Sequence, residues 1–77
     1  MNRRKIKPKF AICIHNEEYP VSLEVRKIYQ LIPDRSAARH KFVRIVDESG
    51  EDYLYPESYF IPIKVPSTVE KALLLAS

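Results

Sequence analysis

The chain has 77 residues, with 13 lysines and arginines against 10 acidic residues, one cysteine and one glycine. A chain of this length forms one domain and buries only about 60 % of the surface that its unfolded form exposes, which excludes a deep substrate cavity beside a core. The single Cys13 excludes an internal disulfide and favours a reducing compartment. No apolar run approaches the roughly 18 residues that span a bilayer, so we expect a cytoplasmic protein without membrane contact.

The positive charge is concentrated at the start of the chain. The first nine residues contain no acid and five basic residues, which are Arg3, Arg4, Lys5, Lys7 and Lys9. The other eight basic residues face all 10 acids, so the rest of the chain is close to neutral. We expect residues 1–9 to form a flexible basic arm that is either solvated or in contact with a phosphate backbone.

The first half of the chain predicts two strands separated by a polar loop. Residues 9–15 alternate with period two, and the larger apolar set that we expect to be buried is Phe10, Ile12 and Ile14. Residues 16–20 are polar and predict a loop with an acidic tip. The segment Ile28–Ile32 is apolar on both faces and is ended by Pro33, which is typical of a strand covered from two sides in a small closed barrel.

The centre of the chain predicts a β-hairpin. Residues 34–40 come first and form a second loop, in which Asp34 can cap a single helical turn. Residues 42–46 then alternate as a half-buried strand, and Asp47–Gly50 reads as a tight turn with glycine supplying a positive φ. Residues 53–55 begin the return strand, and Pro56 ends it by removing a donor.

The end of the chain predicts a short strand and a helix. Pro62 interrupts the apolar residues 60–63, which indicates an edge strand. Ser67 and Glu70 match a capping box, and the following residues are helix-prone and apolar nearly all round. A helix this short needs packing, either on the open end of a barrel or in a dimer contact. We therefore divide the chain into the arm 1–9, a barrel 10–66 and a short C-terminal helix 67–77.

The sequence contains no pattern for catalysis, metal binding or a cofactor. Cys13 and His15 share one face of a strand, but with His40 they fall short of the four ligands of structural zinc. Ser58 lacks the flanking glycines of a nucleophile elbow. A single glycine excludes a glycine-rich phosphate loop. We expect a protein that is not an enzyme and uses no cofactor.

The second half of the chain resembles the Src-homology-3 (SH3) barrel. That family commonly has a hairpin glycine, a strand, a proline and, three positions later, an aromatic residue followed by an apolar one. The matching residues are Gly50, Pro56, Tyr59 and Phe60. The resemblance covers residues 10 to about 65, and it implies a five-stranded antiparallel SH3-like barrel in a mainly β domain.

The resemblance also implies a surface that binds a protein segment. SH3 domains that bind proline-rich peptides hold them between flat aromatic side chains beside an acidic loop. Here Phe42 stands at the tryptophan position, whereas Cys13 and His15 replace two groove tyrosines. The contact residues that we expect are Glu17, Glu18, Phe42, Tyr53, Pro56 and Tyr59.

We accordingly expect a non-catalytic interaction module that is a monomer rather than a dimer and whose partner is another protein. The alternative is an RNA- or DNA-binding barrel, in which aromatic faces stack on bases and basic side chains follow the phosphates. The residues of this alternative site are Arg3, Arg4, Lys5, Arg35, Arg39 and Lys41. Nearby acids, Asp34, Asp47, Glu48 and Asp52, oppose it by diluting the positive field.

Overall fold

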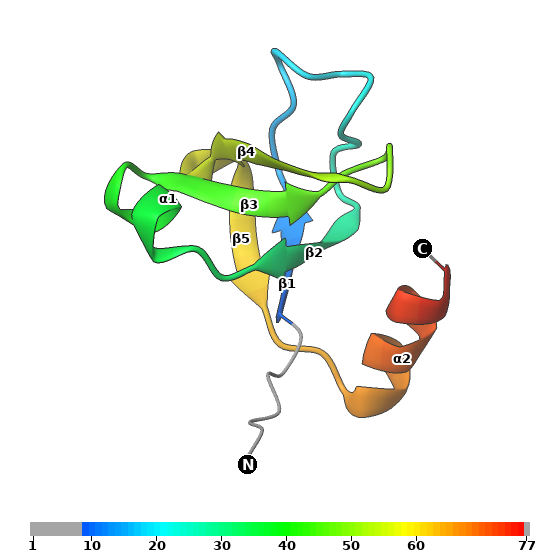
Figure 1. Cartoon of the computed structure of the whole chain (residues 1–77). Helices are drawn as coiled ribbons and strands as arrows, with labels where there is room; N and C mark the ends of the chain where they lie inside the picture. The colour runs from blue at the N-terminus through cyan, green and yellow to red at the C-terminus, as the bar shows by residue number, and fades with distance from the viewer. Residues whose placement is uncertain (1–8, 77) are drawn as a thin grey trace.

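The computed structural model describes residues 9–76, and it consists of five short strands, two helices and one 3-10 turn (Figure 1). The predicted arm lies outside these residues except for Lys9, which begins the first strand. The strands are β1 (Lys9–Cys13), β2 (Ile28–Ile32), β3 (Phe42–Val46), β4 (Asp52–Pro56) and β5 (Phe60–Ile63). The helical elements are α1 (Arg35–Arg39), η1 (Glu57–Tyr59) and α2 (Ser67–Ala76).

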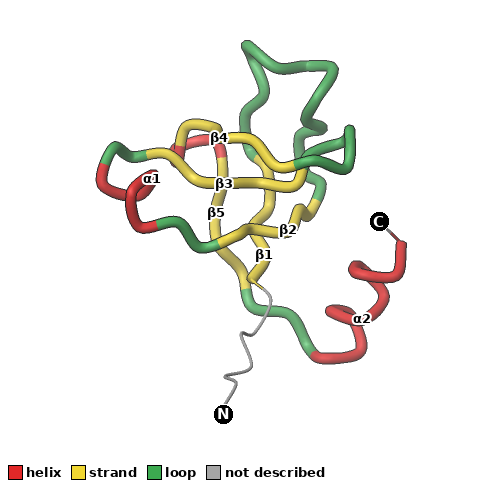
Figure 2. Tube along the Cα trace, viewed as in Figure 1, coloured by secondary structure: helices red, strands yellow, loops and turns green. Residues whose placement is uncertain are grey.

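The strands form one antiparallel sheet in the order β4-β3-β2-β1-β5 (Figure 2). The chain is therefore a mainly β domain with a short C-terminal helix, as predicted. The strands β4 and β5 form the two edges and are not paired with each other, so hydrogen bonds do not close this sheet into a ring. The strand β5 contains Pro62 and lies at an edge, which confirms that part of the prediction.

The core lies on the inner face of the bent sheet. Its members are Ala11, Cys13, Leu23, Tyr29, Ile45, Tyr55 and Phe60. The predicted buried set of the first strand was right for Phe10 and wrong for Ile12 and Ile14, because the residues that face this core are the small Ala11 and Cys13. Ile14 lies beyond the strand and is 37 % exposed, whereas Phe10 is buried outside the core cluster. Small side chains on β1 leave room for the aromatic rings of the neighbouring strands.

The two helices lie beside different parts of the sheet. Asp34 caps α1 by accepting a hydrogen bond from the Ala37 N–H, as predicted. In α2 the Glu70 N–H donates to the Pro66 carbonyl, so Ser67 is the first helical residue rather than the cap. Figure 1 shows α2 beside the sheet. A cavity of about 320 Å³, whose lining includes Phe10, Ile28, Gln30, Leu73 and Leu74, lies between α2 and the strands β1 and β2.

The central hairpin joins β3 to β4 through the predicted turn. The pairing runs from Phe42 opposite Pro56 to Val46 opposite Asp52. Gly50 has a φ of 87°, and its N–H donates to the Asp47 carbonyl at 2.9 Å. The space where a Cβ would stand at Gly50 is open, so the glycine is required by its backbone conformation and not by crowding.

We expect Gly50→Ala to lower the free energy of unfolding by about 1 kcal/mol, as measured by urea denaturation. The positive φ is costly for an alanine, and this cost outweighs the entropy that alanine removes from the unfolded chain. Gly50→Asn is the matched control and is expected to lose less, because asparagine tolerates positive φ. Equal stability of the alanine variant and the natural protein would contradict this role.

Candidate functional site

The long loop that connects β1 to β2, residues 14–27, is held closed at its base and across its middle. We call this segment the first loop. At its base the Cys13 N–H donates to the Lys27 carbonyl, and the Arg26 N–H donates to the Cys13 carbonyl at 2.7 Å. Across its middle the Asn16 side-chain amide donates to the Leu23 carbonyl at 2.9 Å. Because Leu23 is also fully buried, the loop has a fixed attachment to the core.

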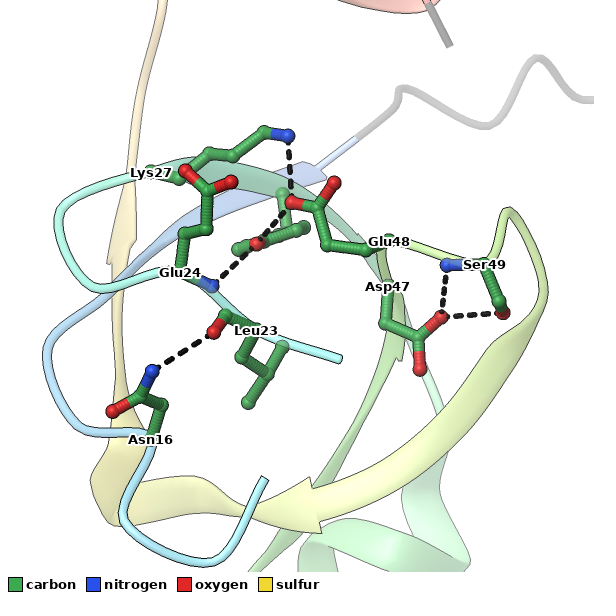
Figure 3. Close-up of polar contacts among 8 residues, drawn as sticks. Asn16, Leu23, Glu24, Lys27, Asp47, Glu48 and Ser49 are labelled. Atoms are coloured by element: carbon green, nitrogen blue, oxygen red, sulfur yellow. Dashed lines mark hydrogen bonds and ion pairs between the residues drawn. The ribbon is translucent and has the colours of Figure 1, made fainter. Parts of the chain in front are cut away.

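A polar network attaches the first loop to the hairpin turn (Figure 3). The Glu48 N–H donates to the Ser22 carbonyl at 3.1 Å. The Glu48 carboxylate accepts hydrogen bonds from the Lys27 ammonium, at 2.6 Å, and from the Tyr29 hydroxyl. The same hydroxyl accepts a bond from the Glu24 N–H. Hydrogen bonds from Lys27 and Tyr29 lower the pKa of Glu48, so this carboxylate stays ionised while it joins the loop, β2 and the turn.

Asp47 is a buried carboxylate beside this network. It is 6 % exposed, and it accepts hydrogen bonds from the Ser49 N–H, the Ser49 hydroxyl and the Tyr55 hydroxyl. Burial acts to raise the pKa of Asp47, but these hydrogen bonds outweigh burial and leave the pKa lowered. Burial and the Asp47 carboxylate together raise the pKa of Tyr55 to about 12. Asp47 is therefore a structural anion that holds the turn against β4.

An aromatic cluster beside the first loop consists of His15, Tyr19, Tyr55 and Tyr59. The rings of Tyr19 and Tyr55 meet edge to face with centroids 4.9 Å apart, and Tyr19 also lies 6.2 Å from Tyr59. His15 is 6.0 Å from Tyr59, and its Nδ1 lies 3.1 Å from a carboxylate oxygen of Glu17. These are the distances at which aromatic rings attract each other, so the cluster is an organised surface.

The acidic tip of the loop lies beside this aromatic cluster. Glu17 and Glu18 are both exposed. Burial, followed by the negative charges of Glu18 and Glu17, raises the pKa of Tyr59. The structure therefore brings together three of the predicted contact residues, Glu17, Glu18 and Tyr59. Tyr19 joins them in the structure but was not among the predicted residues.

The other three predicted contact residues occupy two further places. Phe42 and Pro56 stand directly opposite each other in the β3–β4 ladder, and Phe42 is 40 % exposed. Pro56 directly precedes η1, which contains Tyr59. Tyr53 lies on the hairpin, where it lines an open depression of about 440 Å³ together with Tyr19 and Ser22 of the first loop. The predicted set therefore does not form one continuous groove.

The described part of the predicted basic site lies around α1, at the end of the sheet where β3 begins with Phe42. Arg35 and Arg39 are separated by one helical turn, and both are exposed, as is Lys41. Arg44 instead donates to Asp34 and Asp52, at 2.9 and 3.0 Å. Two of the acids that were expected to dilute the positive field are thus paired with Arg44. Arg3, Arg4 and Lys5 lie outside the described residues.

Within residues 9–76 the structure contains no group of three or more side chains of the kinds that ligate metals. Cys13 is fully buried, its thiol donates to the His15 carbonyl, and burial raises its pKa, so its thiolate is disfavoured. Neither helix of this part of the chain has the length and apolar character needed to cross a membrane.

The fold and these surfaces define a small five-stranded antiparallel β-sheet domain with a C-terminal helix. In comparisons with known proteins, no family model, no curated protein and no solved structure matched the chain.

Two features of the site were missed by sequence reasoning. Tyr19 follows an acidic pair in a loop, and nothing in the local pattern places its ring against residues 55 and 59. Asp47 was predicted as a turn residue, but its burial and its bond to Tyr55 depend on the β3–β4 register. In the sequence, a tyrosine on the second strand of the hairpin, here Tyr55, is a weak signal that its hydroxyl bonds to the carboxylate of the turn.

We expect Asp47→Asn to lower the free energy of unfolding at neutral pH by about 1–3 kcal/mol. The reason is that an amide is a weaker acceptor than a carboxylate for the hydrogen bonds from Ser49 and Tyr55. The lowered pKa means that the folded state stabilises the ionised form of Asp47. This stabilisation is complete above the ordinary aspartate pKa of about 3.9 and disappears as pH falls through the lower folded value. Urea denaturation of both proteins between pH 7 and pH 2 measures the difference.

The stability difference between the natural protein and Asp47→Asn should shrink over that acidic range. Asp52→Asn is the control, and its cost is expected to be smaller because Asp52 forms an exposed ion pair with Arg44. A difference that stays constant down to pH 2 would show that the charge of Asp47 plays no part in stability.

Proposed function

We propose that the chain is a non-catalytic interaction module that binds a segment of another protein at the first loop, on a domain of the SH3-like class. Three features support the SH3-like class: five short antiparallel strands in this order, a long polar first loop, and a tight hairpin before the last strand. The observed fold is a small β-sheet domain with a C-terminal helix, and its assignment to the narrower SH3-like class is part of this proposal.

The observation that carries the proposal is the exposed acidic pair beside packed aromatic rings. Glu17 and Glu18 supply negative charge without an arginine or lysine ion pair among the described residues. Tyr19 and Tyr59 supply rings whose positions are set by their contacts with each other. A protein segment that presents a basic residue next to a flat apolar one, such as proline, would place its charge on the acids and its ring on the tyrosines.

The surface beyond the tyrosines extends the contact. Phe42 and Pro56 form an apolar pair beside η1, and Phe42 is 40 % exposed. An extended segment several residues long can reach from the acidic tip over Tyr59 towards this pair. Tyr53 is left out of the proposed contact: it shares an open depression with Tyr19, but its hydroxyl donates a hydrogen bond to Glu51 of the hairpin.

We expect basic, proline-containing peptides to shift the NMR signals of Glu17, Glu18 and Tyr59 in a titration. The double variant Glu17→Gln with Glu18→Gln should weaken binding by about tenfold or more, because neutral amides do not attract the basic residue. Tyr59→Ala should weaken it similarly by removing the ring.

Glu70→Gln is the matched control, because Glu70 is a carboxylate on α2, away from the first loop. It should bind as the natural protein does. A titration in which such peptides shift none of the first-loop signals would remove the proposal, and so would a double variant of unchanged affinity.

A second candidate function is binding of RNA or DNA at α1, and one observation favours it. Arg35, Arg39 and Lys41 are exposed and make no ion pair with any described residue, while Arg44 occupies Asp34 and Asp52. Phosphates of a nucleic acid chain could pair with these three side chains, and the N-terminal residues Arg3, Arg4 and Lys5 would add to the contact.

For this second candidate we expect weak binding of a single-stranded RNA or DNA oligonucleotide that falls steeply with added salt, as measured by fluorescence anisotropy. Replacing Arg35, Arg39 and Lys41 by glutamine should reduce the salt slope by about one for each phosphate that these side chains no longer neutralise. Replacing Lys64 and Lys71 by glutamine is the control, and it removes two positive charges that lie outside α1. Absence of binding even at low salt would exclude the function.

A further inference from the structure

The two edges of the sheet differ in their capacity to accept another strand. An edge strand exposes every second backbone N–H and carbonyl, and a peptide can pair with these groups if they are free. The edges here are β4 and β5. The registers of the strand pairs, together with the hydrogen bonds that flank each strand, determine which residues point outward.

The edge formed by β5 is blocked. The Ile14 N–H donates to the Tyr59 carbonyl at 2.8 Å and continues the β1–β5 pairing, so alternation places Phe60 and Pro62 outward. The Phe60 N–H already donates to the Glu57 carbonyl, and Pro62 has no N–H. The outward-facing residues of β5 therefore offer no donor to a further strand.

The edge formed by β4 is open. The Asp47 N–H donates to the Glu51 carbonyl at one end of the β3–β4 ladder, and the Glu57 N–H donates to the Lys41 carbonyl at the other. Alternation between these ends directs Asp52 and Leu54 outward. Within residues 9–76 no hydrogen bond uses the backbone N–H of Leu54.

The side chains around this edge are apolar in the middle and acidic at the ends. Tyr53 is 50 % exposed and Leu54 is 42 % exposed. Tyr53 and Leu54 also line the open depression beside the first loop. Glu51 and Glu57 flank the strand and are exposed, and neither forms an ion pair with a described residue.

We propose that β4 binds an extended segment of a partner protein as a sixth strand, and that this segment is apolar or β-branched in its middle with a basic residue at each end. Its backbone would pair with Asp52 and Leu54, and its side chains would cover Tyr53 and Leu54. The basic ends would meet Glu51 and Glu57, which is the charge complementarity that selects this partner.

A second copy of this chain fits the edge less well. Antiparallel pairing of two β4 strands about Leu54 would bring Glu51 of one copy opposite Glu57 of the other, twice. Like charges placed directly opposite each other destabilise a sheet. The proposed edge site adjoins the first-loop site, because Tyr19 lines the same depression as Tyr53 and Leu54, but the two sites use different groups and neither requires the other.

The decisive variant is Leu54→Pro, which removes the central outward donor and costs no hydrogen bond to β3. Proline is accepted on an edge strand when its nitrogen faces outward. The probe is a short peptide of alternating valine and threonine with lysine at both ends, titrated by NMR and calorimetry. We expect Leu54→Pro to weaken its binding by about tenfold or more, and Leu54→Ala, which keeps the N–H, to weaken it much less.

Two measurements on the natural protein keep the test valid if Leu54→Pro fails to fold. Hydrogen exchange of the Leu54 amide should slow when the peptide binds, because that amide becomes hydrogen-bonded. A peptide of the same sequence that is N-methylated on its pairing edge should not bind, and one with glutamate in place of lysine should bind more weakly. The double variant Glu17→Gln with Glu18→Gln should bind the lysine peptide normally, which separates this site from the first loop.

The proposal is overturned if the peptide does not bind, or if it binds without protecting the Leu54 amide. It is also overturned if folded Leu54→Pro binds as tightly as the natural protein. Sedimentation that shows self-association abolished by Leu54→Pro would assign the edge to a second copy of the chain and reject the partner segment.

Discussion

Two consecutive carboxylates at the end of β3 hold the parts of this domain together. Asp47 turns inward and accepts hydrogen bonds from Ser49 and Tyr55, which closes the hairpin. Glu48 turns the other way and accepts bonds from Lys27 and Tyr29, which holds the first loop to the hairpin. A domain this small has little apolar surface to bury. Hydrogen-bonded polar groups that are buried or half-buried therefore contribute substantially to holding the chain in one conformation.

The position of the first loop then determines the candidate binding surface. Small side chains on β1, at Ala11 and Cys13, let aromatic residues of β4 and β5 fill the core. Tyr55 presents its ring edge to Tyr19, and Tyr19 in turn lies beside Tyr59. The acidic tip of the loop is therefore adjacent to rings that are already ordered, so a ligand would lose little free energy in organising them.

The described surface divides into regions with different chemistry. The first loop is acidic and aromatic, the end around α1 is basic, and the β4 edge has free backbone donors between two acids. The edge formed by β5 is protected by Pro62 and by the turn of η1. This asymmetry follows a common requirement of open sheets, in which each exposed edge must be blocked or used.

Much of the local structure could be predicted from sequence, because local rules determine it. The alternation in residues 42–46, the turn ending at Gly50 and the cap at Asp34 all depend on neighbours a few residues away. Ile28–Ile32 was predicted with its observed bounds for the same reason. The acidic tip of the first loop and the basic residues of α1 were also recognisable from the chain alone.

Contacts between distant segments were decided only by the tertiary structure. The inward face of β1 was predicted from side-chain size, but it is set by pairing with β2 and β5, which turns the small Ala11 and Cys13 to the core. The meeting of Tyr19 with Tyr55 and Tyr59 joins residues more than thirty positions apart. Which edge remains open depends on hydrogen-bond alternation across the whole sheet, and no local pattern carries that information.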